Sequence, residues 1–293
     1  MVLLGLASVH GHAQMSELLR IKKLSVEYLV RDDNPAPALA DVFLTISQGQ
    51  VVGLMGESGC GKTTLAMAIL GLLPRERARV LGSIRFRDQE LLSTGERELR
   101  SIRGTGISMI YQEPEMALSP FLRAGDQIAE VVRAHRKTKR KECRDIAFAA
   151  LERMGFDDPQ RIYRSYPHQL SGGQRQRVVF AQALVCDPAL IVADEPTASL
   201  DARSQAKMID LLAQIKEQRQ VSILLISHTP EIQASLADRL AVMSEGKIIE
   251  QGTFDEMYWN PSQSLTREML RPARKAPADE TGAAITAHED VMR

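Results

Sequence analysis

Four short apolar runs without polar alternation recur along the chain, and each predicts a strand that is buried on both faces. They cover residues 51–55, 107–111, 189–193 and 221–226. Apolar residues at helical spacing also predict a helix over 62–73, which Pro74 ends. Buried strands that alternate with helices are typical of an α/β fold with a largely parallel sheet.

Two other kinds of segment surround this core. Partly alternating residues predict strands over 19–30, 42–46 and 82–86, with a turn over 33–37. Residues 113–120 contain two prolines and are predicted to form a loop. Helical spacing then predicts helices over 121–135 and 142–154, and Gly155 ends the second helix. We interpret the basic run 136–141 as a solvated turn rather than a nucleic-acid contact, so residues 113–169 form a helical insert.

The residues after the strand over 51–55 match the phosphate-binding pattern G-x-x-x-x-G-K-[ST]. They are Gly56, Glu57, Ser58, Gly59, Cys60, Gly61, Lys62, Thr63 and Thr64. Glycines let the backbone curl so that N–H groups and a helix N-terminus face a polyphosphate. Lys62 adds a charge for the β- and γ-phosphates, and the Thr63 hydroxyl can ligate Mg²⁺. The strand–loop–helix context favours a nucleotide site over a plain glycine-rich turn.

A second glycine pair begins a helix later in the chain. Ser171, Gly172, Gly173 and Gln174 precede an apolar helix over 178–185. Ser171 is a natural N-cap, and the two glycines let another backbone or a phosphate approach closely. We expect a second anion-binding helix start, without a lysine of its own.

Polar residues follow the buried strands, which end at Gly56, Gln112, Asp194 and His228. In open parallel sheets, ligands lie beyond the carboxyl ends of the strands, so we expect these residues at one edge. Asp194 suits Mg²⁺, and the adjacent Glu195 can orient an attacking water. A lone histidine is more often structural, but its position at the same sheet edge as the other predicted site residues favours a functional role for His228.

Composition narrows the possible functions. Basic and acidic residues balance at 37 each, which argues against a general nucleic-acid binder. The three cysteines have no metal or disulfide spacing and suit a reducing cytoplasm. No apolar run approaches the roughly 20 residues of a membrane span. Residues 1–14 are interpreted as a non-native start or a disordered leader, and residues 271–293 as a disordered tail.

With these motifs, the chain resembles the ATPase subunit of an ATP-binding-cassette transporter from about Leu19 to Leu270. The signature over 170–174 carries the resemblance, together with Asp194-Glu195 followed by Ser199-Leu200-Asp201. The resemblance implies a P-loop NTPase domain over residues 15–270. Its parallel-rich core sheet would be joined by an N-terminal antiparallel β portion and a helical subdomain.

The resemblance also implies a role for each site residue in binding ATP and Mg²⁺. Tyr28 would stack on the adenine, although the residue alone could equally cover a sheet edge. The phosphate loop would hold the phosphates and Mg²⁺. Gln112 would sense Mg²⁺ and the membrane partner, and Asp194 would hold Mg²⁺ through water. Glu195 would be the general base, and His228 would clamp the γ-phosphate.

Two further elements would act between subunits according to the resemblance. Residues 171–174 would close on the nucleotide of a second cassette ATPase, and Asp201 would couple the two sites. The other implied partners are integral membrane permease subunits and, indirectly, an extracytoplasmic solute-binding protein, with no nucleic acid. The implied location is peripheral, on the cytoplasmic face of the inner membrane.

Finer features resemble the dipeptide, oligopeptide and nickel importer branch. They are Glu113-Pro114, the segment ALSP at 117–120 and the segment YPHQ at 166–169. The tail departs from the branch, because residues 261–266 read PSQSLT where Pro-x-His-Pro-Tyr-Thr is usual. The cysteine cluster that many members carry there is also missing.

Three functions are weighed against one another. A transport motor accounts for all the motifs. A soluble cassette ATPase acting on DNA or ribosomes would carry a long coiled coil or two cassettes, but the motifs occur once and no sustained heptads separate them. A small-molecule kinase would explain neither the signature nor Glu195 beside Asp194.

Overall fold

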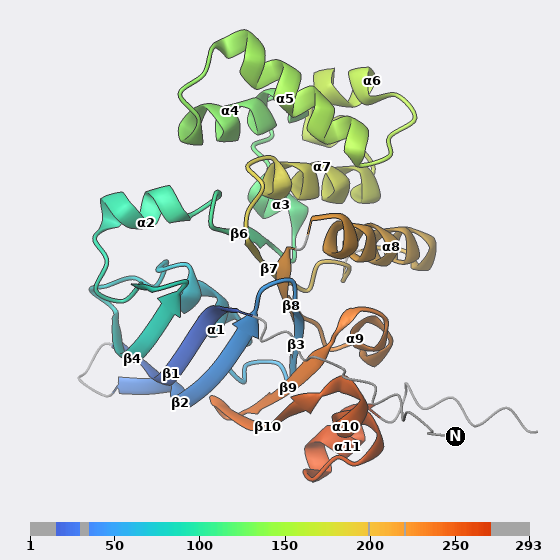
Figure 1. Cartoon of the computed structure of the whole chain (residues 1–293). Helices are drawn as coiled ribbons and strands as arrows, with labels where there is room; N and C mark the ends of the chain where they lie inside the picture. Colours follow the sequence, from blue (N-terminus) through green and yellow to red (C-terminus); the bar gives the residue numbers. More distant parts are fainter. Residues whose placement is uncertain (1–15, 30–34, 199, 220, 271–293) are drawn as a thin grey trace, which may run out of the picture.

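The computed structural model describes residues 16–29, 35–198, 200–219 and 221–270, and its centre is a six-stranded sheet (Figure 1). The strand order is β10-β9-β3-β8-β7-β6. The strands are β3 (Val51–Gly56), β6 (Ile107–Ile110), β7 (Leu190–Asp194), β8 (Ser222–Ile226), β9 (Arg239–Ser244) and β10 (Lys247–Thr253). Neighbouring strands pair in parallel, except that β10 is antiparallel to β9. The parallel-rich core expected from the apolar runs is confirmed.

The sequence expectation did not include β9 or β10. The side chains of β10 are half-buried or exposed along its whole length, so its apolar pattern is weak. Strand β9 is buried, and two of its residues, Leu240 and Val242, pack against Met257 and Leu270 from the C-terminal helices. Its place in the core therefore depends on contacts made late in the chain.

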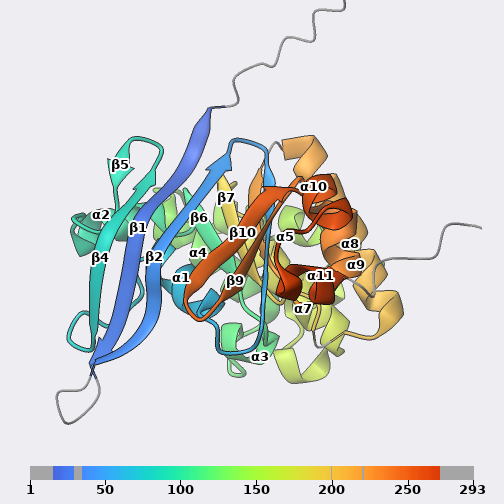
Figure 2. The same cartoon turned by 90° about the horizontal axis from the view of Figure 1, so that it is seen from below.

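A second sheet has the order β2-β1-β4-β5 and is antiparallel throughout. Its strands are β1 (Glu17–Leu29), β2 (Pro35–Ser47), β4 (Ala78–Phe86) and β5 (Gln89–Glu90). The turn expected over 33–37 is wrong where the structure describes it, because β2 already begins at Pro35, opposite Leu29. Strand β2 lies at the edge of its sheet, where the missing N–H of a proline is tolerated. Figure 2 shows β2 beside β10, and the N–H of Ala40 donates to Gly246 O at 2.9 Å.

Helices flank the central sheet and form a separate helical layer at the top of Figure 1. They are α1 (Lys62–Ile69), α2 (Glu96–Ile102), α3 (Pro114–Ala117), α4 (Ala124–His135), α5 (Arg140–Arg153), α6 (Pro159–Arg164), the 3₁₀ turn η1 (Pro167–Gln169), α7 (Gly172–Leu184), α8 (Ala202–Arg219), α9 (Pro230–Leu236), α10 (Phe254–Trp259) and α11 (Ser264–Leu270).

Several helix boundaries differ from those expected; α4, for example, begins at Ala124 rather than at residue 121. Helix α1 ends at Ile69 because Gly71 adopts a left-handed conformation (φ 62°) that ends a helix. The segment over 113–120 is not all loop, because α3 begins with Pro114 at a position that proline favours. Helix α5 starts at Arg140, so it includes the last two residues of the basic run.

Strand β8 shows how the core is divided. Ile223 and Leu225 belong to a hydrophobic cluster that includes Phe180 of α7 and extends into the helical layer. The alternate residues Leu224 and Ile226 belong to a second cluster, beneath the antiparallel sheet and α1. Burial on both faces explains the unbroken apolar runs in the sequence.

No helix in the described part of the chain combines the length and the apolar character that crossing a membrane requires. The interpretations of residues 1–14 and 271–293 lie outside the described residues, as does Ser199 of the motif that ends at Asp201.

Candidate nucleotide-binding and catalytic site

The phosphate loop joins β3 to α1 and is shaped by two glycines that no other residue could replace without a clash. A Cβ at Gly56 would lie 2.4 Å from Met243 O, and one at Gly61 would lie 2.7 Å from Ala38 O. Gly61 also has a φ of 112° and caps α1 without any side-chain hydrogen bond. The first N–H groups of α1 therefore lack a capping side chain, as an anion-binding helix start requires.

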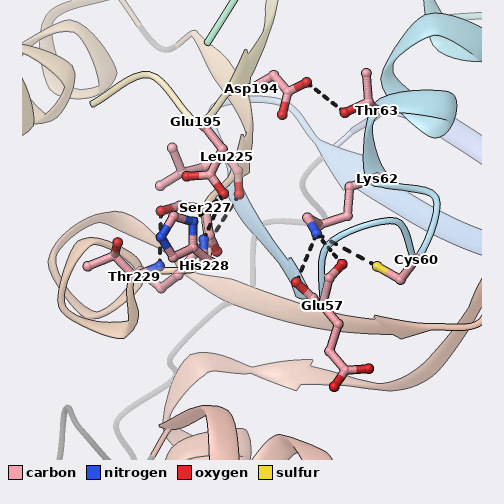
Figure 3. Close-up of polar contacts among 12 residues, drawn as sticks. Glu57, Cys60, Lys62, Thr63, Asp194, Glu195, Leu225, Ser227, His228 and Thr229 are labelled. Carbon is pink, nitrogen blue, oxygen red and sulfur yellow. Dashed lines mark hydrogen bonds and ion pairs between the residues drawn. The ribbon is translucent and has the colours of Figure 1, made fainter. Parts of the chain in front are cut away.

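Lys62 folds back over this loop (Figure 3). Its Nζ donates to Gly56 O and Glu57 O, both at 2.8 Å, and lies 3.7 Å from Cys60 Sγ. Cys60 is a buried residue of this loop. The ammonium is thus held by neutral acceptors at the place where the sequence predicted phosphate contacts.

Thr63 on α1 meets Asp194 at the end of β7, and the Thr63 hydroxyl donates to Asp194 Oδ2 at 3.0 Å (Figure 3). Burial raises the pKa of the Asp194 carboxyl, and the nearby Glu195 raises it further. The hydrogen bond from Thr63 and the charge of Lys62 act against this rise. The two residues predicted to surround a magnesium ion therefore lie side by side, with oxygen ligands of the kind Mg²⁺ prefers.

Glu195 and His228 come together at the ends of the neighbouring strands β7 and β8. Glu195 Oε1 accepts from the backbone N–H of His228 at 3.0 Å and lies 2.8 Å from its ring Nδ1. A carboxylate only accepts hydrogen bonds, so Nδ1 carries the proton in this contact. Glu195 has a left-handed backbone (φ 47°), and its own N–H donates to Ile226 O at 2.9 Å. This unusual conformation turns the carboxylate towards His228.

Tyr28, near the end of β1, lies beside α1. Its hydroxyl lies 3.3 Å from Thr64 Oγ1, and its ring packs at the margin of the core. Tyr28 thus contacts the phosphate-binding helix through its hydroxyl. Adenine stacking by this ring stays a prediction.

Gln112 follows β6 at the same edge of the sheet, because β6 pairs in parallel with β7. Its side chain is exposed, and no hydrogen bond between described residues joins it to Thr63 or Asp194. The strand ends at Gly56, Gln112, Asp194 and His228 are therefore gathered along one edge, and Gly56 and Asp194 each accept a hydrogen bond from a side chain of α1.

The signature segment begins α7 with reciprocal hydrogen bonds. The N–H of Gln174 donates to Ser171 Oγ at 3.3 Å, and the N–H of Ser171 donates to Gln174 Oε1 at 3.0 Å. The predicted N-cap is confirmed as a complete capping box. A Cβ at Gly172 would meet nothing within 4 Å. No hydrogen bond among described residues links 171–174 to 56–64.

Asp201 lies beside the signature as the residue before α8. Its Oδ1 accepts from the N–H of Ser204 and its Oδ2 from the Ser204 hydroxyl, both at 2.9 Å. These hydrogen bonds lower the pKa of Asp201. Ser204, which the sequence analysis missed, also lies against the signature, since a Cβ at Gly173 would be 3.1 Å from its hydroxyl. An aspartate three residues before a serine at a helix start is the signal that could have identified it.

A profile of the ABC transporter family matches residues 39–198. The dipeptide transport ATP-binding protein DppD of Bacillus subtilis (strain 168) is 38% identical over 93% of this chain and 81% of that protein. The oligopeptide transport ATP-binding protein AppD of the same organism is 40% identical over 87% of this chain and 78% of that protein. A dimeric ATP-binding cassette in a post-hydrolysis state, bound to ADP and Pi, superimposes with a TM-score of 0.71 and 26% identity over 80% of this chain and 98% of that one.

The chain belongs to the ABC transporter family and is an ATP-hydrolysing subunit of that family. The relatives named above are dipeptide and oligopeptide transport ATP-binding proteins, so the resemblance to this branch is confirmed. Because the relatives are transport proteins, the transport motor is favoured among the three functions weighed from the sequence.

Proposed function

We propose that this chain hydrolyses ATP to energise the import of peptides through a membrane permease. The observation that supports it most directly is the juxtaposition of Asp194, Glu195 and His228 with the phosphate loop. The names of the relatives support peptides as the cargo, since both describe peptide transport. Cargo selectivity itself would belong to the permease and to an extracytoplasmic binding protein.

ATP binding is proposed at the phosphate loop, between Tyr28 and Asp194. The uncapped N–H groups at the start of α1 suit phosphate oxygens. Lys62 would exchange its contacts with Gly56 O and Glu57 O for the more strongly accepting oxygens of the β- and γ-phosphates. The Tyr28 ring would stack on the adenine.

The Thr63 hydroxyl and the Asp194 carboxylate fit a magnesium ion by the chemistry of their donors. Both supply oxygen, and they lie 3.0 Å apart before any ion intervenes. We propose Thr63 as a direct ligand, with Asp194 and Gln112 acting through water. When bound, Mg²⁺ would neutralise developing charge on the β- and γ-phosphate oxygens.

Glu195 is proposed as the general base. Its Oε1 is occupied by two donors from His228, whereas no hydrogen bond within the described part of the chain reaches Oε2. Oε2 is therefore available to accept a proton from an attacking water. His228 positions the carboxylate through Nδ1, and its ring is exposed enough to contact the γ-phosphate.

A second cassette is proposed to complete each site. Residues 171–174 are exposed or half-exposed, and the space in front of Gly172 is open. A dimeric cassette is among the similar structures. The nucleotide held by one chain would occupy the signature of the other, and Asp201 would lie at the same junction.

The permease is proposed to dock on an apolar patch made of Met116, Phe121 and Leu122, directly after Gln112. Met116 is 80% exposed and Phe121 is 85% exposed, which is unusual for such large apolar side chains. The position of residues 112–120, which leave the active-site edge and enter the helical insert, predicts docking on this segment with Met116 and Leu118 as contacts. That assignment of Leu118 is wrong, because its side chain is buried. Binding there would hold the chain at the cytoplasmic face of the membrane.

A transport assay tests the proposal. The chain is reconstituted in proteoliposomes with a peptide permease and its binding protein, and uptake of a labelled peptide is measured with and without ATP. ATP-dependent uptake that disappears in Glu195→Gln supports the proposal. Uptake of nickel ions in place of peptides would refute the peptide assignment.

A further inference from the structure

Arg175, the residue after the signature, joins three segments that are separate in the sequence. Its Nε donates to Pro167 O at 2.9 Å and to Leu170 O at 3.1 Å, so it holds η1 and the residue before the N-cap. Its Nη1 donates to Glu115 on α3. A planar guanidinium can satisfy such divergent acceptors at once, which a lysine cannot do in the same geometry.

Stability alone does not explain this arrangement well. The Arg175 side chain is 25% exposed, but that of Glu115 is 74% exposed, and exposed ion pairs contribute little to folding. Arg175 also lies near the N-terminus of α7, where a positive charge opposes the helix dipole. The partners of Arg175 offset this unfavourable position, and one of them comes from a different part of the helical layer.

Glu115 is on the segment that carries the docking patch. It precedes Met116 on α3, and α3 packs against α7. The rest of that segment is fixed. Leu118 is buried, and the Gln127 side chain bonds Ser119 N at 2.8 Å, Ser119 O at 3.0 Å and Leu122 O at 3.0 Å. These bonds tie residues 119–122 to α4, whereas α3 itself is joined to α7 by packing and by the Glu115–Arg175 ion pair.

We infer that the Glu115–Arg175 ion pair links permease docking to the position of the signature. Binding of the permease to the patch displaces α3, and the ion pair with Glu115 transmits this displacement to Arg175. Leu170 and the start of α7 then move with Arg175. Glu115 is thus a positioning residue that acts through Arg175. The inference rests on the proposed docking at Met116, Phe121 and Leu122.

The test compares Glu115→Gln with Glu130→Gln. Glu130 forms an exposed ion pair with Arg133, but both residues lie on α4, so no segments are linked. Basal ATPase activity, permease affinity and permease-stimulated ATPase activity are measured for each reconstituted variant. For Glu115→Gln we expect basal activity and affinity like those of the wild type and a stimulation reduced by about fivefold or more, as for a lost allosteric coupling. Glu130→Gln should behave as the wild type in all three measurements.

Hydrogen exchange of the full chain supplies a second readout that does not need the permease. Glu115→Gln should speed amide exchange at residues 170–175, and Glu130→Gln should not. Unchanged stimulation or unchanged exchange in Glu115→Gln overturns the link. Loss of permease affinity in Glu115→Gln also overturns it, because Glu115 would then be a docking residue. If the permease does not stimulate the ATPase activity of the wild type, both the proposed function and the link are refuted. If the permease stimulates the wild type and Glu115→Gln equally, only the link is refuted.

Discussion

The ring Nδ1 of His228 lies 2.8 Å from Glu195 Oε1, and the backbone N–H of the same histidine donates to the same oxygen at 3.0 Å. His228, which follows β8, thus binds one carboxylate oxygen of Glu195, which follows β7. This contact fixes one oxygen of the carboxylate, and no hydrogen bond within the described part of the chain reaches the other oxygen, Oε2.

Glu195→Gln should bind ATP and scarcely hydrolyse it. Glutamine keeps the shape of the side chain and an acceptor for His228, but it cannot take a proton from water. General-base assistance contributes about 10²–10⁴-fold, and we expect turnover to fall by that factor. Nucleotide affinity is measured by fluorescence titration and turnover by phosphate release. Turnover near the wild-type value would remove Glu195 from the mechanism.

Asp194→Asn should stabilise the nucleotide-free protein at neutral pH. The raised pKa of Asp194 means that the folded state binds the proton more tightly than the unfolded state, whose value is near 3.8. Protonated Asp194 is therefore compatible with burial, and stability is lost as the pH rises through the interval between 3.8 and the raised pKa. Asparagine removes the buried charge and can still accept from Thr63. We expect a Tm higher by about a few degrees.

The same variant should lose its response to Mg²⁺ with nucleotide. Thermal unfolding is followed with nucleotide in the presence and absence of Mg²⁺, and the exposed Asp210→Asn on α8 serves as the control. A lower Tm for nucleotide-free Asp194→Asn would contradict the proposed destabilisation of the protein by the buried charge of Asp194. Undiminished stabilisation by Mg²⁺ would show that Asp194 does not help to hold the ion.

Met116→Asp and Leu118→Asp should fail in different ways although they are two residues apart. Met116 is exposed, so Met116→Asp should fold, keep its basal ATPase activity and lose stimulation by the permease. Leu118 is 4% exposed, and a buried charge without a partner destabilises a fold by about 3–5 kcal/mol. Denaturant unfolding should show this loss for Leu118→Asp, while Leu118→Met should be tolerated. Full stimulation of Met116→Asp would place the docking surface elsewhere.

The residues of the candidate site that the structure brings together could be predicted from the sequence because the motifs that contain them are local. A phosphate loop, an N-cap and an acid after a buried strand are each defined by a few consecutive residues, and parallel strands bring their ends together. What it did not predict depends on contacts between distant segments. The burial of Leu118 requires the helical layer to be assembled, and the strand conformation of Pro35 requires β1 as a partner. The bonds that hold Lys62 Nζ depend on the conformation of the loop before a phosphate arrives.

The final prediction is that two chains share each active site. Gly172→Asp introduces a charge where the γ-phosphate of the partner should lie, but its own phosphate loop is intact. The variant should fold, since a Cβ at Gly172 meets nothing within 4 Å. Lys62→Ala weakens the phosphate loop and keeps its signature. Each variant alone should be nearly inactive, and a mixture should regain part of the activity through heterodimers with one complete site.

ATP binding by the isolated monomer gives the decisive comparison. Recovery of activity in the mixture requires in addition that one complete site can hydrolyse ATP alone and that the chain forms a dimer with itself. Residues 171–174 make no hydrogen bond to residues 56–64 within the described part of the chain. Gly172→Asp should therefore bind ATP as a monomer with the affinity of the wild type, while Lys62→Ala should bind it weakly. Dimer formation with ATP, measured by light scattering in the Glu195→Gln background, should be lost in Gly172→Asp. If Gly172→Asp abolishes ATP binding by the monomer, the signature serves its own chain's nucleotide and the shared site is wrong.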